Sequence, residues 1–241
     1  MIRRSKFVLA LLAPLAALGL AIPAHAASPE LAKVLSQLDA ASAQFHSAQA
    51  DFHWDQYTKI VEETDTQTGT VFFKRAGATT QMAAQIRQLN GKDDPKTIVY
   101  DGTTLKLYQP RIHEITQFNA SKNKNQYESF LTLGFGGSGK DLAAKWNITL
   151  VGNETLKDGA TSVAVVHLDL VSTQDSVRNM FSKISIWVDP VRGVSLKQVF
   201  TEPTGDSRTA YYSNIKTNTP IDPKTFILDG PKLGAKTTIH Q

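Results

Sequence analysis

An alternation of apolar and polar residues runs through most of the chain after residue 46. In Ile184–Phe200 (ISIWVDPVRGVSLKQVF) the alternation stops at Asp189-Pro190 and resumes after Gly193, which is typical of two strands joined by a tight turn. The same pattern predicts strands at 48–59, 69–75, 79–89, 98–100, 104–108, 112–118, 147–151, 162–171, 183–188, 194–201 and 208–215. Within 79–89, a helix over Met82–Ile86 is the alternative. Strands in this number, without an internal repeat or a linker, predict one curved sheet or barrel.

Short turn motifs separate several of these strands. Asn90-Gly91, Asp94-Pro95 and Gln109-Pro110 are dipeptides that favour a reversal of the chain. Asp101-Gly102 lies between two alternating segments and favours a hairpin. These motifs predict that neighbouring strands are mostly antiparallel.

Two regions follow a helical pattern instead. Ser28–Phe45 has a Ser N-cap, Pro29 at the first helical position and Glu30 in the first turn. Its apolar stripe consists of Leu31, Val34, Leu35, Leu38, Ala41 and Phe45. The second region, Asn119–Trp146, predicts two short helices around a glycine-rich break. Their apolar residues are Tyr127, Phe130, Leu131 and Leu133 in the first helix, and Leu142, Ala143 and Trp146 in the second.

The glycine-rich break, Gly134–Asp141 (GFGGSGKD), nearly matches a phosphate-binding loop. That motif needs Ser or Thr after its lysine, and Asp141 stands there. The motif should also follow a strand, whereas the preceding residues predict a helix. The break is better interpreted as a mobile glycine hinge between two helices.

The first residues have the pattern of a secretory signal peptide. Arg3, Arg4 and Lys6 precede an apolar run, Phe7–Ile22, and Ala24-His25-Ala26 is a small-x-small cleavage site. We therefore predict a signal peptide at residues 1–26 and a single domain at residues 27–241. Cleavage after Ala26 would leave a protein without an apolar anchor, in the periplasm or outside the cell.

Charge and cysteine content narrow the function. Removing the three positive charges of the leader lowers the net charge from +4 to +1, which does not favour nucleic acid binding. The chain has no cysteine, so it has neither a disulfide framework nor a cysteine for lipid attachment.

No catalytic motif is present in the sequence. The histidines lack the i, i+4 spacing of a helical zinc site, and no serine lies in a Gly-x-Ser-x-Gly elbow. We therefore predict no catalytic residue, no metal and no cofactor, and a protein that is not an enzyme. A secreted hydrolase with a site assembled from distant strands stays open as an alternative.

An open curved sheet leaves two possibilities for its concave face. The face can bind an apolar guest beneath capping helices, or side chains can fill the interior as an ordinary core. The residue pattern alone favours the filled interior.

Several segments, in their order along the chain, resemble the LolA-like family of periplasmic outer-membrane lipoprotein carriers. Tyr100–Pro110 (YDGTTLKLYQP) resembles its Tyr-Asp-Gly hairpin, and Ile184–Gln198 resembles its Asp-x-x-Gly hairpin. Tyr211–Leu228 (YYSNIKTNTPIDPKTFIL) resembles its closing strand and final turn. The helix from Ser28, followed by Phe45 and Phe52, resembles its opening.

The resemblance implies a mainly β (α+β) fold, an incomplete antiparallel barrel of about eleven strands. An N-terminal helix and short lid helices would cover an apolar cavity for the acyl chains of lipoproteins. The implied partners are acylated lipoproteins or another lipid, an inner-membrane ABC transporter and an outer-membrane acceptor, and the protein would be a monomer. A related half-barrel that carries or senses a different lipid or amphiphile is the alternative.

The resemblance also implies a role for one polar residue. The family has a Lys-Arg pair at the end of its second strand, and its arginine helps to hold the lid and gates loading. Lys74-Arg75 matches this pair, although Ala76 stands where the family has proline. The alternative is a surface arginine at a strand end.

Alternation along the strands, together with the first helix of the insert, selects the residues expected to line the cavity. They are Val71, Phe73, Arg75, Leu105, Leu107, Phe130, Leu131, Leu133, Ile184, Ile186 and Val188.

Overall fold

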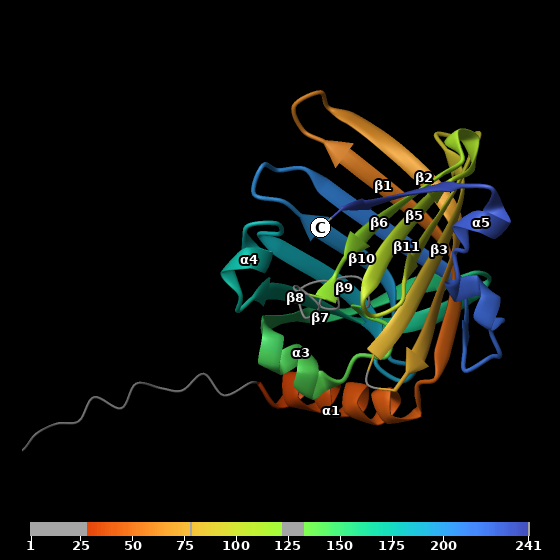
Figure 1. Ribbon diagram of the computed structural model, residues 1–241. Coiled ribbons are helices and arrows are strands. Elements are labelled where there is room, and N and C mark those ends of the chain that lie inside the picture. The colour runs from red at the N-terminus through yellow and green to blue at the C-terminus, as the bar shows by residue number, and fades with distance from the viewer. Residues whose placement is uncertain (1–27, 78, 122–132, 241) are drawn as a thin grey trace, which may run out of the picture.

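The strands of the described residues form one twelve-stranded sheet. The sheet curls over on itself (Figure 1). The computed structural model describes residues 28–77, 79–121 and 133–240. The strands are β1 (Ser47–Thr58), β2 (Glu63–Ala76), β3 (Thr79–Leu89), β4 (Lys92–Tyr100), β5 (Thr104–Gln109), β6 (Glu114–Asn119), β7 (Trp146–Asp158), β8 (Thr161–Ser172), β9 (Lys183–Asp189), β10 (Val194–Thr201), β11 (Ser207–Thr217) and β12 (Lys236–His240). Their order across the sheet is β12-β6-β5-β4-β3-β2-β1-β11-β10-β9-β8-β7.

The helices in the described part of the chain are short apart from the first. They are α1 (Pro29–Gln44), α3 (Gly139–Lys145), α4 (Asp175–Arg178) and α5 (Gly230–Leu233), with 3₁₀ turns η1 (Pro110–Ile112) and η3 (Pro223–Phe226). The predicted N-cap of α1 is confirmed, since the Ser28 hydroxyl accepts a hydrogen bond from the Leu31 amide. Figure 1 shows α1 and α3 together below the lower end of the sheet.

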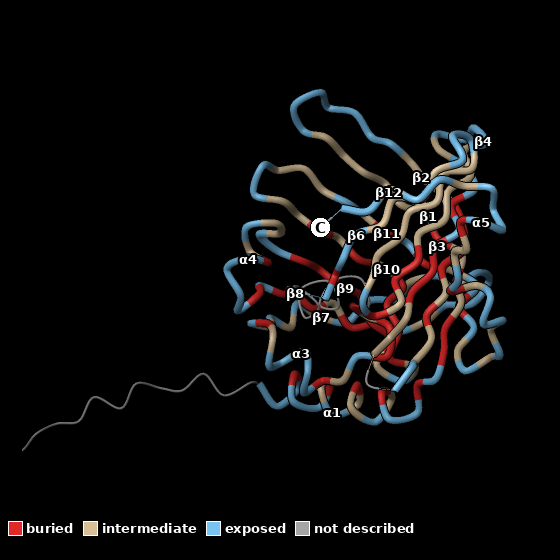
Figure 2. Tube along the Cα trace, viewed as in Figure 1, coloured by how far each residue is buried: buried red, intermediate tan, exposed pale blue. Residues whose placement is uncertain are grey.

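Strand pairing gives the sheet one continuous inner face, the face that packs against α1. In the β2–β4 half of the sheet, Phe73 lies opposite Met82, and Met82 lies opposite Tyr100. In the β8–β10 half, Gln198 lies opposite Ile186, and Ile186 lies opposite Leu168. Because directly opposed residues project to the same side of a sheet, these side chains share the inner face. Figure 2 shows the buried residues concentrated along the inner parts of the strands.

Two apolar clusters fill most of the inner face. One centres on β1–β4 and includes Phe52, Phe73 and Tyr100. The other lies between α1 and strands β7–β10, where Leu38 of the helix belongs to the same cluster as Leu168. A small third cluster around Phe226 lies on the opposite side of β3 and β4. The apolar stripe predicted for the first helix therefore covers the β7–β10 half of the sheet.

The predicted mainly β fold, an incomplete barrel with an N-terminal helix, is confirmed. Eleven strands pair antiparallel, as expected, but β12 was not predicted and pairs in parallel with β6. The turn predicted at Asp94-Pro95 is wrong, because both residues lie within β4. Pro95 fits there because the β3–β4 register shifts beside it and the pairing with β5 starts only at Thr97.

Two sequence predictions lie wholly or largely outside the described residues. These are the signal peptide at residues 1–26 and the first helix of the insert, which includes Phe130 and Leu131. The second helix of the insert is confirmed as α3, except that Trp146 is already the first residue of β7. Among the described residues, no helix is both long and apolar enough to cross a membrane.

Candidate functional site

The segment Leu133–Ser138, called the glycine segment below, enters the half-barrel between α1 and the sheet. Its Phe135 is almost completely buried and forms an isolated β-bridge with Val194 of β10. The Phe135 ring stacks on Phe73 with 4.0 Å between ring centroids, and it meets Tyr212 edge-on at 5.0 Å. The predicted hinge therefore lies inside the barrel, in contact with the inner face.

Two glycines allow this position. Gly134 and Gly136 each have φ of 74°, a conformation that residues with a side chain rarely adopt. A Cβ at Gly134 would overlap the Ser195 hydroxyl, and a Cβ at Gly136 would overlap the Phe45 ring. Glycine is therefore required on both sides of Phe135 for its ring to reach the interior.

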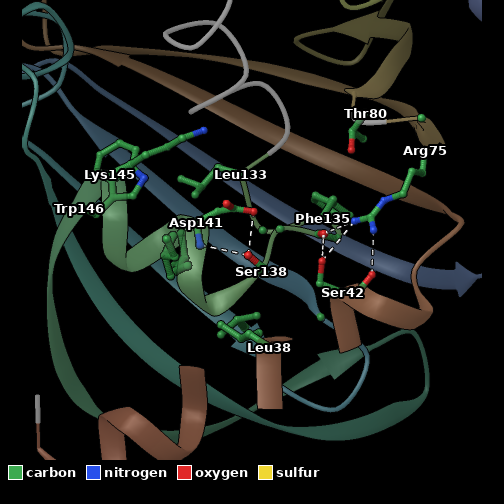
Figure 3. A pocket seen from close by; sticks show the side chains of 18 residues that line it. Leu38, Ser42, Arg75, Thr80, Leu133, Phe135, Ser138, Asp141, Lys145 and Trp146 are labelled. Carbon is green, nitrogen blue, oxygen red and sulfur yellow. Dashed lines mark hydrogen bonds between the residues drawn. The ribbon is translucent and has the colours of Figure 1, made fainter. Parts of the chain in front are cut away.

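Arg75 links the glycine segment to α1. Its guanidinium donates to the Ser42 carbonyl at 2.9 Å, to the Ser42 hydroxyl at 3.2 Å and to the Gly136 carbonyl at 2.6 Å. The Ser42 hydroxyl itself donates to the Gly136 carbonyl at 2.8 Å. Arg75 thus joins the end of β2 to the helix and to the segment, as Figure 3 shows.

A second polar contact lies deeper in the barrel. The Gln198 side-chain amide donates to the Leu133 carbonyl at 2.6 Å and accepts from the Tyr212 hydroxyl at 3.2 Å. Burial raises the pKa of Tyr212, so its hydroxyl stays protonated as a donor. Ser195 is also buried there, and its hydroxyl has no hydrogen-bond partner among the described residues.

A cavity of about 350 Å³ lies between the glycine segment, α1, α3 and the sheet (Figure 3). We call this region the closed end. Its apolar walls include Leu38, Leu133, Leu142, Trp146, Ile186 and Val188. Its polar lining includes Arg75, Ser42, Thr80 and Lys145. The mixture of walls suits a molecule with an apolar part and hydrogen-bonding oxygens.

A second cavity, of about 470 Å³, lies over β1–β5 and the start of β11. We call this region the mouth. Its apolar residues are Trp54, Ile86, Leu89, Ile98 and Leu107. Arg208 lies at its rim, where its guanidinium donates to the Gln56 side chain at 3.0 Å. Within the described residues, no carboxylate lies within 4.0 Å of the Arg208 guanidinium.

The structure places the predicted lining residues as follows. Arg75, Leu133, Ile186 and Val188 line the closed-end cavity. Ile184 is buried in the cluster beneath α1, and Val71 and Phe73 are buried in the cluster around Phe135.

The β5 residues lie farther from the closed end. Leu107 lines the mouth, and Leu105 packs against the cluster that contains Phe73. The described candidates thus share the inner face but are divided between two cavities and the packed interior between them.

Sequence reasoning missed four residues of the closed end. They are Ser42, Phe135, Gln198 and Tyr212. An aromatic residue between two glycines was the available signal for Phe135, because it combines an apolar side chain with unusual backbone freedom. The other three residues carry no such local signal, because the residues they bind are distant from them in the sequence.

The described residues offer no support for a metal centre. None of their His, Asp and Glu side chains gather in a group of three or more that could hold a metal ion. His167 lies 3.3 Å from both Glu154 and Asp169, but this contact lies away from both cavities.

Comparison with known proteins defines the fold. No family model matches the sequence, and no curated protein matches it either. An uncharacterized conserved protein from Thermus thermophilus is 11% identical, with 88% of this chain and 99% of that chain covered at a TM-score of 0.52. MucB is 14% identical, with 84% of this chain and 64% of that chain covered at a TM-score of 0.50. The fold of this chain is therefore similar to the folds of these two structures.

A putative outer membrane lipoprotein-sorting protein domain from Vibrio parahaemolyticus also matches. It is 13% identical, with 84% of this chain and 99% of that chain covered at a TM-score of 0.45. Identities this low bear on the fold alone, because one fold can serve unrelated functions. The function has to be argued from the closed end and the mouth themselves.

Proposed function

We propose that this LolA-like chain is a periplasmic carrier, not an enzyme, that binds the acyl chains of lipoproteins and ferries them from the inner to the outer membrane. The observation that carries the proposal is the inner face, which is apolar over most of its area, covered by α1 and α3 at one end and hollow at both ends. Acyl chains need such a shield, because exposing each methylene to water costs about 0.8 kcal/mol.

The candidate ligand-binding residues have distinct roles in this proposal. Val71, Phe73, Leu105, Leu107, Ile184, Ile186 and Val188, with Leu133 and the neighbouring Phe130 and Leu131, would form the apolar wall. Arg75 would bind polar groups of the cargo and fasten the closed end, since it contacts both α1 and the glycine segment. An inner-membrane ABC transporter would load the carrier, and an outer-membrane acceptor would unload it.

The test is native mass spectrometry of the protein purified from its own cell envelope. We expect acylated lipoproteins to copurify with the wild type. Ile186→Asp should abolish this, because it places a charge in the closed-end cavity, where ionised groups are strongly disfavoured. Ile239→Asp is the matched control, because Ile239 is an exposed residue of β12. A wild-type protein without any bound lipid would contradict the proposal.

A specific observation favours a second candidate, a carrier of free anionic amphiphiles. Among the described residues, no carboxylate lies within 4.0 Å of the Arg208 guanidinium at the rim of the mouth, and apolar side chains line the same cavity. An anionic headgroup could bind there while its chain contacts Trp54 and Leu107. Copurification of anionic lipid in place of lipoprotein would favour this candidate.

A further inference from the structure

The glycine segment presents to the barrel interior what an acyl ligand would present, an apolar group beside carbonyl oxygens. We propose that the space filled by the Phe135 ring, called the Phe135 slot below, is the acyl-binding site of this chain. The ligand is an acyl chain with its carbonyl group, and the glycine segment leaves the slot when the ligand enters. This inference rests on the proposed carrier function and names the part of the inner face that binds the cargo.

The packing of Phe135 defines the apolar part of the slot. Phe73 and Phe135 are nearly parallel, with 12° between their ring planes, and Tyr212 closes the other side at 83°. The surrounding cluster includes Val71, Met82, Ala84 and Tyr100. With the ring removed, the slot would be an apolar channel between two aromatic walls, a shape that accepts a methylene chain.

The hydrogen bonds of the segment define the polar part. Arg75 and Ser42 donate to the Gly136 carbonyl, and Gln198 donates to the Leu133 carbonyl. Departure of the segment would take away the acceptor of the buried Gln198 amide and of the Ser42 hydroxyl, and one of the acceptors of Arg75, which is unfavourable unless new acceptors arrive. The carbonyl oxygen of an ester or amide-linked acyl group has the same chemistry as the two backbone carbonyls that it would replace.

The charge on Arg75 is compatible with a neutral ligand. Among the described residues, the acceptors of its guanidinium are the Ser42 and Gly136 carbonyls and the Ser42 hydroxyl, and no carboxylate lies within 4.0 Å. A ligand carbonyl would keep this arrangement. The carboxylate of a free fatty acid would instead form an ion pair with Arg75. Comparing binding of an acid with binding of its ester therefore shows whether the ligand is a free acid or an esterified acyl group.

The glycine segment is joined to the barrel by few backbone bonds within the described part of the chain. The Ser195 amide donates to the Gly134 carbonyl at 2.7 Å, and the Gly136 amide donates to the Gly193 carbonyl at 3.1 Å. The isolated bridge between Phe135 and Val194 does not extend into a ladder. The sheet would therefore keep its strand pairing when the segment leaves.

The closed arrangement also leaves one polar group unused. The hydroxyl of Ser195 is buried beside Gly134, and no residue that the structure describes forms a hydrogen bond with it. A ligand oxygen or a water carried in with it could bind this hydroxyl, since buried polar groups are normally hydrogen-bonded. The interior thus contains a donor that the glycine segment does not satisfy.

The test measures binding of cis-parinaric acid and its methyl ester, whose fluorescence rises in an apolar site. Phe135→Ala empties the slot, so it should bind the ester about tenfold or more tightly than the wild type, because the ring no longer competes. Phe226→Ala is the matched control: it also removes a buried ring, but from the cluster on the opposite side of the sheet. Its affinity should equal that of the wild type.

A second variant tests the polar part. In the Phe135→Ala background, Gln198→Leu should weaken ester binding about threefold to tenfold, the value of one hydrogen bond, while competition by dodecane stays unchanged. One outcome would overturn the Phe135 slot and leave the carrier function standing. In that outcome the wild type binds the probes, and a folded Phe135→Ala variant binds them no more tightly than the wild type. Absence of binding by both proteins would overturn both.

Discussion

The closed end and the mouth lie on the same inner face, yet they are built differently. At the closed end, Leu168 and Ile184 are fully buried beneath α1, and Arg75 fastens the helix to the glycine segment. At the mouth, Leu107 is only half-buried and Arg208 is exposed. No helix covers the mouth among the described residues that line it. The comparison teaches that one end of the half-barrel is packed beneath a helix and supplies stability, whereas the other leaves apolar side chains partly exposed to solvent.

The largest expected effect is a difference in stability between the two ends. Leu168→Ala should lower the free energy of unfolding by about 2–5 kcal/mol, because it leaves a cavity in a packed cluster. Leu107→Ala should cost about 1 kcal/mol or less, since its side chain is already partly in water. Urea unfolding of both variants measures the difference, and equal losses would contradict the contrast.

The second-largest expected effect on stability comes from removing the Arg75 hydrogen bonds. Arg75→Gln should lower the free energy of unfolding by about 1.5–3 kcal/mol, because hydrogen bonds from a charged group are lost. Hydrogen exchange should also become faster in α1, because Ser42 loses its hydrogen bonds from Arg75. Arg87→Gln, a change at an exposed arginine, should stay within about 0.5 kcal/mol. Unchanged exchange in α1 would show that Arg75 does not fasten the closed end.

A smaller effect concerns ligand choice at the mouth. Arg208→Gln should weaken binding of cis-parinaric acid about twofold to fivefold, the value of an exposed charge pair, and leave binding of its methyl ester unchanged. Lys216→Gln, at the other end of β11, removes an equal charge as the control. If the acid and the ester lost affinity equally, the carboxylate headgroup would not bind at Arg208.

The smallest effect is a pH dependence at the β4–β5 turn. Burial alone would raise the pKa of Asp101, but hydrogen bonds from Thr104 and Thr103 lower it below its ordinary value of 3.8. Because the pKa in the folded state is lowered, the stabilisation is present above 3.8 and is lost as the pH falls through the folded-state pKa. Asp101→Asn should therefore reduce stability at about pH 6 by at most about 1 kcal/mol, and less at about pH 3. Urea midpoints at both pH values test this, and a loss that does not depend on pH would contradict it.

Much of the fold follows from local sequence patterns. The alternation of apolar residues predicted eleven strands, because a half-buried strand needs one apolar face. The Ser28 N-cap and the apolar stripe marked α1 for the same local reason. Short β12 carries little apolar signal in KTTIH, so its pairing with β6 depends on tertiary contacts that no local pattern contains.

The site was only partly predictable. Alternation placed Arg75 and Phe73 on the inner face, and both contact the glycine segment there. The position of Phe135 could not be derived, since a glycine-rich stretch is compatible with many conformations and its burial depends on contacts with β2, β10 and β11. Gln198 looked like an ordinary polar residue of a strand until its partner, the Leu133 carbonyl, was known.

The pairing of β1 with β11 has a consequence for how the chain reaches this structure. Phe52 lies opposite Tyr212, about 160 residues further along the chain, and this pair is at the centre of the sheet. Contacts between residues so distant in sequence slow folding, because a long loop must close before they form. The two central strands can pair only after nearly the whole polypeptide has been synthesised, so any shorter N-terminal part of the chain lacks the pairing at the centre of the sheet.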